Sequence, residues 1–425
     1  MRLLWLCNSL LPEIASKISH KMGRPESWLI GIYEEIKQNP EITLNYLYPG
    51  DIQKKSVTFG NATFIPFAME HKPVVSKEQV NHFCEILIDY RPDVIHIFGT
   101  EFSHTCAMIM AAEQEGYLDR TVISIQGLVS VYSKHYNAYL PHNVTNQRTL
   151  RDWIKRDSIM KQQHLFAQKG ILEERALSKI RHVIGRTDWD RACVERLNPD
   201  VIYHHCNENL RDAFYKNQWT YDNCEKYSIF LSQWYSPLKG LHLVLEAMAD
   251  LIKRYPEVHL YTTGEFELQG SFWSRIRYSN YKKYCAKLIH ENGLDGHVTF
   301  LGMLNEQEMC DRFLKSNVFV CSSSIENSPN SVGEAMIMGV PTVSSDVGGV
   351  KNMLKHEKDG FIYQPDAPYM LAYYVKWFFD NPDKLADFSI NSRQHAMKTH
   401  NRTENMRKLF EIYREIEWGA CQEKV

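Results

Sequence analysis

The stretch that decides the fold is Val318–Val350, VFVCSSSIENSPNSVGEAMIMGVPTVSSDVGGV. It begins with an apolar run of strand length and continues through a turn rich in Ser, Asn and Pro. The apolar period of a helix follows, which we predict to open near Ser331. Gly339 and Pro341 end this helix, and a second apolar strand leads to Gly348-Gly349. A strand, a helix and another strand in succession predict a βαβ unit of a parallel sheet.

The turn inside this segment is a predicted ligand site. It places backbone N–H groups at the positive end of the helix, where anions bind. Glu326 lies in the turn, and Glu334 lies about one turn into the helix. One carboxylate can therefore meet a sugar while the other reaches a second set of hydroxyls. A pair of glutamates can also be a solvated helix start, so the flanking residues have to decide between the two interpretations.

The same alternation of strands and helices continues over nearly the whole chain. We predict strands at Leu3–Cys7, Ile42–Leu47, Asp93–Phe98, Thr121–Gln126, His182–Ile184, Ser228–Ser232, His259–Thr263, Val298–Leu301, Val318–Cys321, Thr342–Ser345 and Phe361–Tyr363. Predicted helices separate them, at Glu26–Gln38, Phe102–Glu115, within Gln147–Lys179, and at Leu241–Arg254, Trp273–Asn292, Glu306–Lys315, Ser331–Met338 and Tyr369–Asp380. Two such runs predict an α/β protein of two doubly wound, Rossmann-like domains facing a central cleft. We place their boundary in the polar segment Asn198–Tyr227, between residues 205 and 206.

Composition fits a two-domain enzyme and excludes other classes. The chain has 425 residues, 44% of them hydrophobic, and a net charge of −2. That charge argues against a nucleic-acid partner. The ten cysteines are scattered without a CxxC pair, which indicates a reducing cytosol. We interpret His204-His205-Cys206 as linker polarity and Met1–Leu11 as a first strand. No apolar run is long enough to span a membrane, so we expect a soluble, cytoplasmic protein.

The segment Val318–Val350 resembles the Glu-x7-Glu signature of the retaining glycosyltransferases of family four, which have the two-domain GT-B fold. Glu326 and Glu334 match the two glutamates. Gly333-Glu334-Ala335-Met336 and Gly339-Val340-Pro341 match the end of that motif. The resemblance is strongest from Ser228 to Tyr363. It implies a first, acceptor-binding domain of residues 1–205, a second, donor-binding domain of residues 206–401, and a final helix, residues 402–425, that returns to the first domain.

The resemblance also implies a reaction and its substrates. A hexose moves from a nucleoside-diphosphate sugar, such as a UDP- or GDP-hexose, to a glycan or lipid-linked acceptor, with retained configuration and without a metal or other cofactor. Glu326 hydrogen-bonds the donor sugar, and Glu334 binds the ribose. The segment between them holds sugar and diphosphate, through Asn327, Ser328, Pro329, Asn330 and Ser331. A bacterial polysaccharide pathway is the implied setting.

Cations for the diphosphate are expected on both domains. Lys239-Gly240 follows the strand Ser228–Ser232 and resembles the phosphate lysine of the family; we expect it in the first turn of a helix, against the helix dipole. Where the family has an arginine, this chain has Gln233. Either another cation such as Arg186 or Arg191 substitutes, or the phosphates are held with less charge. In the first domain, Gly23 and Arg24 precede a predicted helix. Their loop resembles a phosphate-binding glycine loop, and a plain capped helix start is the alternative.

Several residues of the first domain are candidates for the acceptor side. Gln126 stands where many family members have a histidine; it can donate and accept hydrogen bonds but cannot act as a general base. We expect it to act in the transfer step with Glu326 and Lys239. Glu101 and His104 follow a strand end, and Arg186 and Trp189 follow another. Asp188 and Asp190 mimic a metal-binding DxD, but helix capping explains them better.

The helical segment near residue 150 combines two kinds of side chain. Its basic residues alternate with apolar ones, in the order Arg148, Leu150, Arg151, Trp153, Ile154, Lys155, Arg156, Ile159 and Lys161. Such a helix can lie on an anionic membrane, at the inner membrane surface where a lipid-linked acceptor waits. A solvated face is the preferred interpretation, because Asp152 and Asp157 interleave.

Two rival functions stay open on sequence alone. One is a related GT-B enzyme, an epimerase or a phosphorylase-like protein, although no phosphorylase cofactor-lysine motif is visible. The other is a catalytically silent scaffold that binds a sugar nucleotide, an alternative prompted by Gln126 and Gln233 in place of the usual histidine and arginine.

Overall fold

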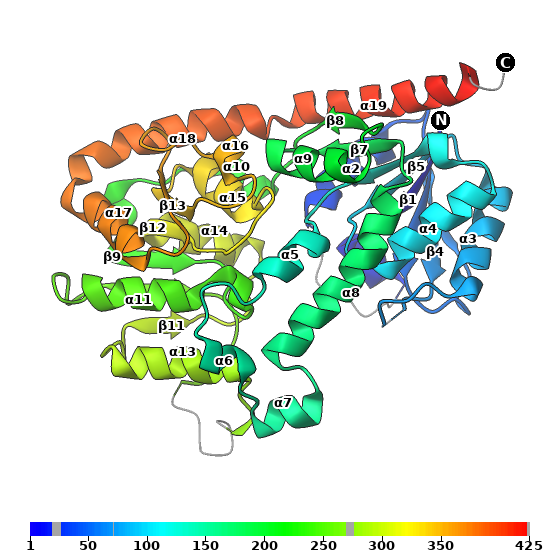
Figure 1. Ribbon diagram of the computed structural model, residues 1–425. Coiled ribbons are helices and arrows are strands. Elements are labelled where there is room, and N and C mark those ends of the chain that lie inside the picture. Colours follow the sequence, from blue (N-terminus) through cyan, green and yellow to red (C-terminus); the bar gives the residue numbers. More distant parts are fainter. Residues whose placement is uncertain (19–26, 71, 269–275, 423–425) are drawn as a thin grey trace. The chain divides into compact units, whose positions relative to one another are not determined.

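The computed structural model describes residues 1–18, 27–70, 72–268 and 276–422. The chain forms two compact units (Figure 1). Unit 1 comprises Met1–Val131, Leu165–Asn209 and His400–Val425; unit 2 comprises Tyr132–His164 and Leu210–Thr399. The predicted boundaries at residues 205 and 401 stay predictions. The segment Tyr132–His164, which we expected in the first domain, is grouped with unit 2.

Unit 1 is built on an eight-stranded sheet of order β3-β4-β2-β1-β5-β6-β7-β8. All neighbours are parallel except β3 and β4. The strands are β1 (Arg2–Leu6), β2 (Thr43–Pro49), β3 (Val57–Phe59), β4 (Ala62–Phe67), β5 (Val94–Phe98), β6 (Thr121–Ser124), β7 (His182–Gly185) and β8 (Ile202–His205). Its helices are α1 (Pro12–Lys17), α2 (Ser27–Gln38), α3 (Lys77–Tyr90), α4 (Ser103–Gln114), α9 (Asp188–Leu197) and α19 (Arg402–Gln422), and α5 (Val129–His135) and α8 (Ile159–Leu177) contain residues of both units.

Side chains of β1 show why helices cover both faces of this sheet. Successive residues of a strand point to opposite faces. Leu3 and Trp5 lie in an apolar cluster with side chains of α2 and α19. Leu4 and Leu6 lie in a second cluster with side chains of α3 and α4. A strand that is apolar at every position is thus buried on both sides, as the continuous run predicted.

Unit 2 is built on a six-stranded parallel sheet of order β11-β10-β9-β12-β13-β14. The strands are β9 (Glu225–Leu231), β10 (His259–Thr262), β11 (Val298–Phe300), β12 (Ser316–Cys321), β13 (Thr342–Ser345) and β14 (Phe361–Tyr363). Its helices are α6 (His142–Asn146), α7 (Leu150–Lys155), α10 (Asp212–Lys216), α11 (Leu241–Leu251), α13 (Asn280–Glu291), α14 (Glu306–Lys315), α15 (Asn330–Met338), α16 (Val350–Met353), α17 (Pro368–Asp380) and α18 (Leu385–Thr399). The predicted fold class, with two doubly wound parallel sheets, is confirmed.

The strand order places one topological switch point in each sheet. In unit 2 the order reverses between β9 and β12, and in unit 1 it reverses between β1 and β5. Ligands of open α/β sheets bind beyond the carboxyl ends of the strands at such points, because the connections there depart in opposite directions. The loops after β9 and β12, and those after β1 and β5, are therefore the places to search for a site.

One local prediction was wrong, and two features were missed. Ile202–His205, read as linker, is strand β8 at the edge of the sheet, and a ring nitrogen of His204 lies 3.1 Å from one of His182 on β7. The hairpin-like pair β3 and β4 was not predicted. Helical structure between residues 147 and 179 is interrupted after α7, where Arg156 has a left-handed φ of 54°.

Candidate active site

The switch point of unit 2 joins a lysine to a glutamate. Lys239 comes from the loop after β9, and Glu326 comes from the loop after β12. The ammonium Nζ of Lys239 donates to Oε1 of Glu326 over 2.5 Å, and the Ser323 hydroxyl donates to the same oxygen over 2.7 Å. Glu326 is buried, whereas the Lys239 side chain keeps 31% of its exposure. Two residues that are far apart in sequence thus form one ion pair at the expected edge of the sheet.

The close approach of the two loops depends on Gly240. This residue has a left-handed φ of 69°, and a Cβ built there would lie 2.0 Å from the carbonyl oxygen of Ser322. The Ser322 hydroxyl donates to the carbonyl oxygen of Lys239 over 2.9 Å. Lys239 itself ends a 3₁₀ turn, Pro237–Lys239, and Gly240 is the N-cap of α11. Our prediction that Lys239 lies in the first turn of the α-helix was therefore wrong by two residues.

Gly348 holds the Glu326 turn from the other side. Its φ is 50°, and a Cβ built there would lie 1.8 Å from the carbonyl oxygen of Glu326. The backbone N–H of Gly349 donates to that same carbonyl over 3.1 Å. Any side chain at position 348 would therefore collide with the backbone of the observed turn. The pair Gly348-Gly349, at the end of the segment Val318–Val350, is thus explained by backbone packing against Glu326.

Lys239 is a cation at neutral pH. Burial lowers the pKa of its ammonium, but the charge of Glu326 and the hydrogen bond to it outweigh burial and raise the pKa above its ordinary value. Lys239 is thus a partly exposed cation in contact with the turn that precedes α15.

Glu334 forms the second ion pair of unit 2, with Arg211. Both Nε and Nη2 of Arg211 contact Oε1 of Glu334, at 2.8 and 2.7 Å. The other carboxylate oxygen, Oε2, accepts no hydrogen bond from a residue that the structure describes. Burial raises the pKa of Glu334 above its ordinary value, and the charge and hydrogen bond of Arg211 oppose this only in part. Arg211 precedes the short helix α10 in the segment read as linker, and no sequence signal marked it.

The start of α15 separates the two glutamates. The helix begins at Asn330, one residue before the predicted position, and Pro329 is its N-cap without a side-chain hydrogen bond. The backbone N–H of Asn327 donates to the Tyr132 hydroxyl over 3.0 Å. Ser328 and Ser331 are partly exposed, and Gln233, in the loop after β9, is exposed.

The switch point of unit 1 brings Glu101 and His104 together through Asn8. The Asn8 amide donates to Oε1 of Glu101 over 3.4 Å, and its oxygen lies 2.8 Å from Nε2 of His104. Within the described part of the chain, Oε2 of Glu101 has no hydrogen-bond partner although it is buried. Burial raises the pKa of Glu101. Burial and the Lys169 charge lower the pKa of His104 to about 3, so its ring is neutral at pH 7.

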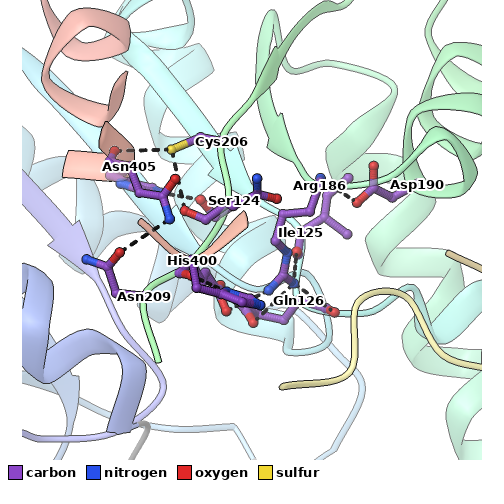
Figure 2. A network of polar contacts seen from close by, with 12 residues as sticks. Ser124, Ile125, Gln126, Arg186, Asp190, Cys206, Asn209, His400 and Asn405 are labelled. Atoms are coloured by element: carbon purple, nitrogen blue, oxygen red, sulfur yellow. Dashed lines mark hydrogen bonds and ion pairs between the residues drawn. The ribbon is translucent and has the colours of Figure 1, made fainter. Parts of the chain in front are cut away.

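A second polar network in unit 1 contains Gln126 and Arg186 (Figure 2). Arg186 donates to the Ile125 carbonyl over 2.8 Å and forms an ion pair with Glu208 at 2.6 Å. The Gln126 amide donates to Glu208 over 2.5 Å. The charge of Arg186 is therefore balanced within unit 1. Glu208, like Arg211, was not recognised from the sequence.

The remaining predicted positions divide into three groups. Asp190 forms a capping box with Thr187, the N-cap of α9, which confirms the capping interpretation of the DxD-like pair. Trp189 is partly buried in the apolar cluster of α3 and α4, and Arg191 is exposed and pairs with Glu195 at 2.7 Å. Gly23 and Arg24 lie outside the described residues. Among the described residues, no group of three or more His, Cys, Asp or Glu side chains is placed to hold a metal ion.

Comparison with known proteins finds a family model that matches part of the chain. Residues 213–395 match the family model Glycosyl transferases group 1, and this range contains Lys239, Glu326 and Glu334. D-inositol 3-phosphate glycosyltransferase of Corynebacterium urealyticum is 25% identical over 179 residues, which are 42% of this chain and 41% of that protein. The chain thus matches less than half of the length of such curated relatives.

Solved structures resemble the chain over nearly its whole length. Sucrose-phosphate synthase of Thermosynechococcus elongatus has a TM-score of 0.70 at 14% identity, covering 98% of this chain and 99% of that one. HepE of Anabaena, solved in complex with UDP-glucose, has a TM-score of 0.67 at 15% identity, covering 98% and 100%. At this identity the likeness concerns the fold. The chain has the GT-B fold, and its residues 213–395 are similar to the glycosyl transferases group 1 family.

Proposed function

We propose that the protein is a retaining, metal-independent glycosyltransferase. It moves a hexose from a nucleoside-diphosphate sugar to a hydroxyl of a glycan or lipid-linked acceptor. The observation that carries the proposal is the pair of ion pairs at the switch point of unit 2, Lys239 with Glu326 and Arg211 with Glu334. A cation beside a helix start suits a diphosphate, and two carboxylates suit the hydroxyls on either side of it.

Each of these residues has a proposed role in binding the donor. Lys239 and the start of α15, with Asn327–Ser331, hold the diphosphate. Glu334 binds the ribose through Oε2, because Arg211 already occupies Oε1. Glu326 orients the hexose. Since Lys239 pairs with Glu326 in this structure, the diphosphate competes with Glu326 for that ammonium group.

The proposed transfer keeps the configuration at the anomeric carbon. The bond between this carbon and the phosphate oxygen breaks, and the bond to the acceptor oxygen forms on the same face. The acceptor proton passes to the departing phosphate oxygen, and Lys239 stabilises the negative charge of the leaving group. No side chain of the protein needs to act as a nucleophile.

Unit 1 is proposed to bind the acceptor. The unpartnered Oε2 of Glu101 at the switch point supports Glu101, with His104 as a neutral neighbour. Gln126 remains a proposed contact of the reacting sugar, and Arg186 and Trp189 remain candidates next to it. Gly23, Arg24 and Gln233 remain proposed donor contacts.

The setting proposed is the cytoplasm of a bacterium, in polysaccharide biosynthesis. The nine cysteines whose side chains the structure describes form no disulfide with one another, as a reducing compartment favours. No helix in the described part of the chain is long and apolar enough to cross a membrane.

A panel of nucleotide sugars tests the proposal. Thermal unfolding with each nucleoside diphosphate comes first, since specific stabilisation identifies the donor base; UDP is the first choice because HepE was solved with UDP-glucose. Release of nucleoside diphosphate and transfer to glycan acceptors are then measured, with and without EDTA. Product anomers are assigned by NMR.

Single substitutions test which residues form the donor site. Glu334→Ala and Lys239→Ala should lower turnover about 100-fold or more, as loss of a transition-state contact does, without unfolding the protein. Lys253→Ala, at an exposed lysine beyond α11, is the matched control. Nucleotide binding without hydrolysis or transfer would favour the silent scaffold. Conversion of the donor sugar without release of the nucleotide would favour an epimerase.

A further inference from the structure

Helix α7 presents its large apolar side chains to solvent. Leu150 is 61% exposed, Trp153 is 70% exposed and Ile154 is 64% exposed. All three belong to one short helix, Leu150–Lys155, in unit 2. Met160, next along the chain, is also exposed. Scattered apolar residues on a surface need no explanation, but a cluster of this kind marks an interaction site.

The outward position of these side chains is fixed by a buried acid on the same helix. The Asp152 side chain has no exposed surface. Its Oδ2 accepts the backbone N–H of Thr149 over 3.1 Å, which caps α7 itself. The same oxygen accepts the backbone N–H of Asn280 over 3.1 Å, at the start of α13. The polar side of α7 is therefore anchored to α13 of unit 2, while the apolar side chains of α7 are exposed.

Positive charge surrounds the apolar side chains. Residues 148–161 contain five basic residues and two acidic ones, a net charge of +3 in a chain whose total is −2. Both acids are paired with Arg151, which contacts Asp152 at 3.3 Å and Asp157 at 2.8 Å; Asp152 is buried and Asp157 is partly exposed. The sequence favoured a solvated face because these two acids interleave; in the structure Arg151 pairs with both of them. Four exposed basic residues remain around the apolar centre, Arg148, Lys155, Arg156 and Lys161.

Apolar and basic side chains of this segment line one groove. Trp153, Ile154 and Met160 line a groove together with Arg156 and Lys161. We call the seven exposed residues Arg148, Leu150, Trp153, Ile154, Lys155, Arg156 and Lys161 the α7 patch.

We propose that the α7 patch docks the protein on an anionic membrane surface. Trp and aliphatic side chains enter the boundary between head groups and acyl chains, while flexible Lys and Arg side chains reach the lipid phosphates. The charge of the patch is complementary to anionic head groups. A protein partner is less well matched, because lysine is depleted in the centre of protein interfaces. This inference deepens the proposed function: it rests on it only in giving a lipid-linked acceptor as the reason for docking.

Vesicle binding tests the inference without any turnover. The full chain is sedimented with vesicles of phosphatidylcholine and phosphatidylglycerol at about 7:3, and with vesicles of phosphatidylcholine alone. We expect binding to the anionic vesicles that weakens as salt is added. The double variant Trp153→Ser/Ile154→Ser should lower the partition coefficient at least about tenfold, because it removes most of the inserted apolar surface. The double variant Lys155→Gln/Arg156→Asn should lower it about 25-fold, at about fivefold for each charge near the surface.

The control variant is Trp418→Ser, at a tryptophan of α19 that is 69% exposed outside the patch. It should leave vesicle binding unchanged, and all variants should keep the unfolding temperature of the parent. Absence of binding to anionic vesicles overturns the inference, as does equal binding of the parent and the Trp153→Ser/Ile154→Ser variant. A dimer in solution that this variant dissociates also overturns it, since the patch would then be covered by a second copy.

Failure here is separable from failure of the proposed function. Donor hydrolysis in solution should be the same in parent and patch variants, because the α7 patch contains none of the residues proposed to bind the donor. Active enzyme without vesicle binding contradicts only the docking proposal. Vesicle binding without hydrolysis or transfer contradicts only the transferase proposal.

Discussion

Replacing Lys239 by methionine isolates the charge of the ion pair from its bulk. The change leaves the Glu326 carboxylate buried, with the Ser323 hydroxyl as its remaining donor at 2.7 Å. Removing one partner of a fully buried pair costs about 3–5 kcal/mol. The Lys239 side chain is 31% exposed, so water reaches the pair and a loss of about 2 kcal/mol in the free energy of unfolding is expected.

The second variant, Glu326→Gln, and the double variant complete a thermodynamic cycle. Both single variants destabilise, but the double variant has neither an unpaired ammonium nor an unpaired carboxylate. Its loss of stability should therefore be smaller than the sum of the two single losses by at least about 1 kcal/mol. Turnover should behave differently. It should fall about 100- to 1000-fold in Lys239→Met and should not recover in the double variant, because the charge that meets the diphosphate is still missing.

Two assays are run on four proteins, which are the parent, the two single variants and the double variant. Thermal unfolding follows stability, where a loss of 2 kcal/mol corresponds to a shift of about 4–8 °C for a domain of this size. Release of nucleoside diphosphate from the preferred nucleotide sugar follows turnover. Strictly additive stability losses would refute the ion pair. Recovery of turnover in the double variant would refute a role of Lys239 beyond holding Glu326.

Three further predictions concern single positions. Gly348→Ala should lower donor turnover at least about tenfold and cost about 1–2 kcal/mol, because alanine resists its positive φ and its Cβ collides with the Glu326 carbonyl; wild-type turnover would contradict this. Arg211→Ala should cost about 3 kcal/mol and weaken nucleoside diphosphate binding, since it leaves Glu334 buried without its partner; calorimetric titration showing unaltered affinity would count against the ribose role. His96 has a pKa lowered to about 3 by burial, so the unfolded chain alone takes up this proton between pH 6.5 and 3, and stability falls as the pH falls through that range. The destabilisation caused by His96→Gln should therefore be smaller at pH 5 than at pH 7 by about 2 kcal/mol in urea titrations, and an equal difference at both pH values would argue against a neutral buried ring.

Much of the fold was predictable because local signals and burial agree in the central strands. Strand β13 was predicted with its observed bounds, and β12 to within two residues, since turn residues flank each apolar run. Strand β8 was missed for the opposite reason. It lies at the edge of its sheet, and its exposed and half-exposed residues include His204 and His205, which give no apolar run. Edge strands carry weak sequence signals because one neighbour is solvent.

Residues of the candidate site were predictable only where they belong to a recognisable sequence motif. Glu326, Glu334 and Lys239 stand in or beside recognisable segments. Arg211 and Glu208 do not, because their roles arise from pairing with residues 123 and 82 positions away. Such pairs depend on how strands are ordered, which no local pattern records. The reversal of order at β9 and β12 is what brings distant charges to one edge.

That reversal also has a consequence for the order of events as the chain folds. β9 and β12 are neighbours in the sheet but are separated in sequence by two complete strand–helix units. Bringing them together closes a long loop, which is among the slow steps of folding. The lysine and the glutamate meet only after this step. The proposed donor nucleotide needs both residues, so it does not bind a sheet in which β9 and β12 are still apart. Its binding therefore reports that these two strands have paired.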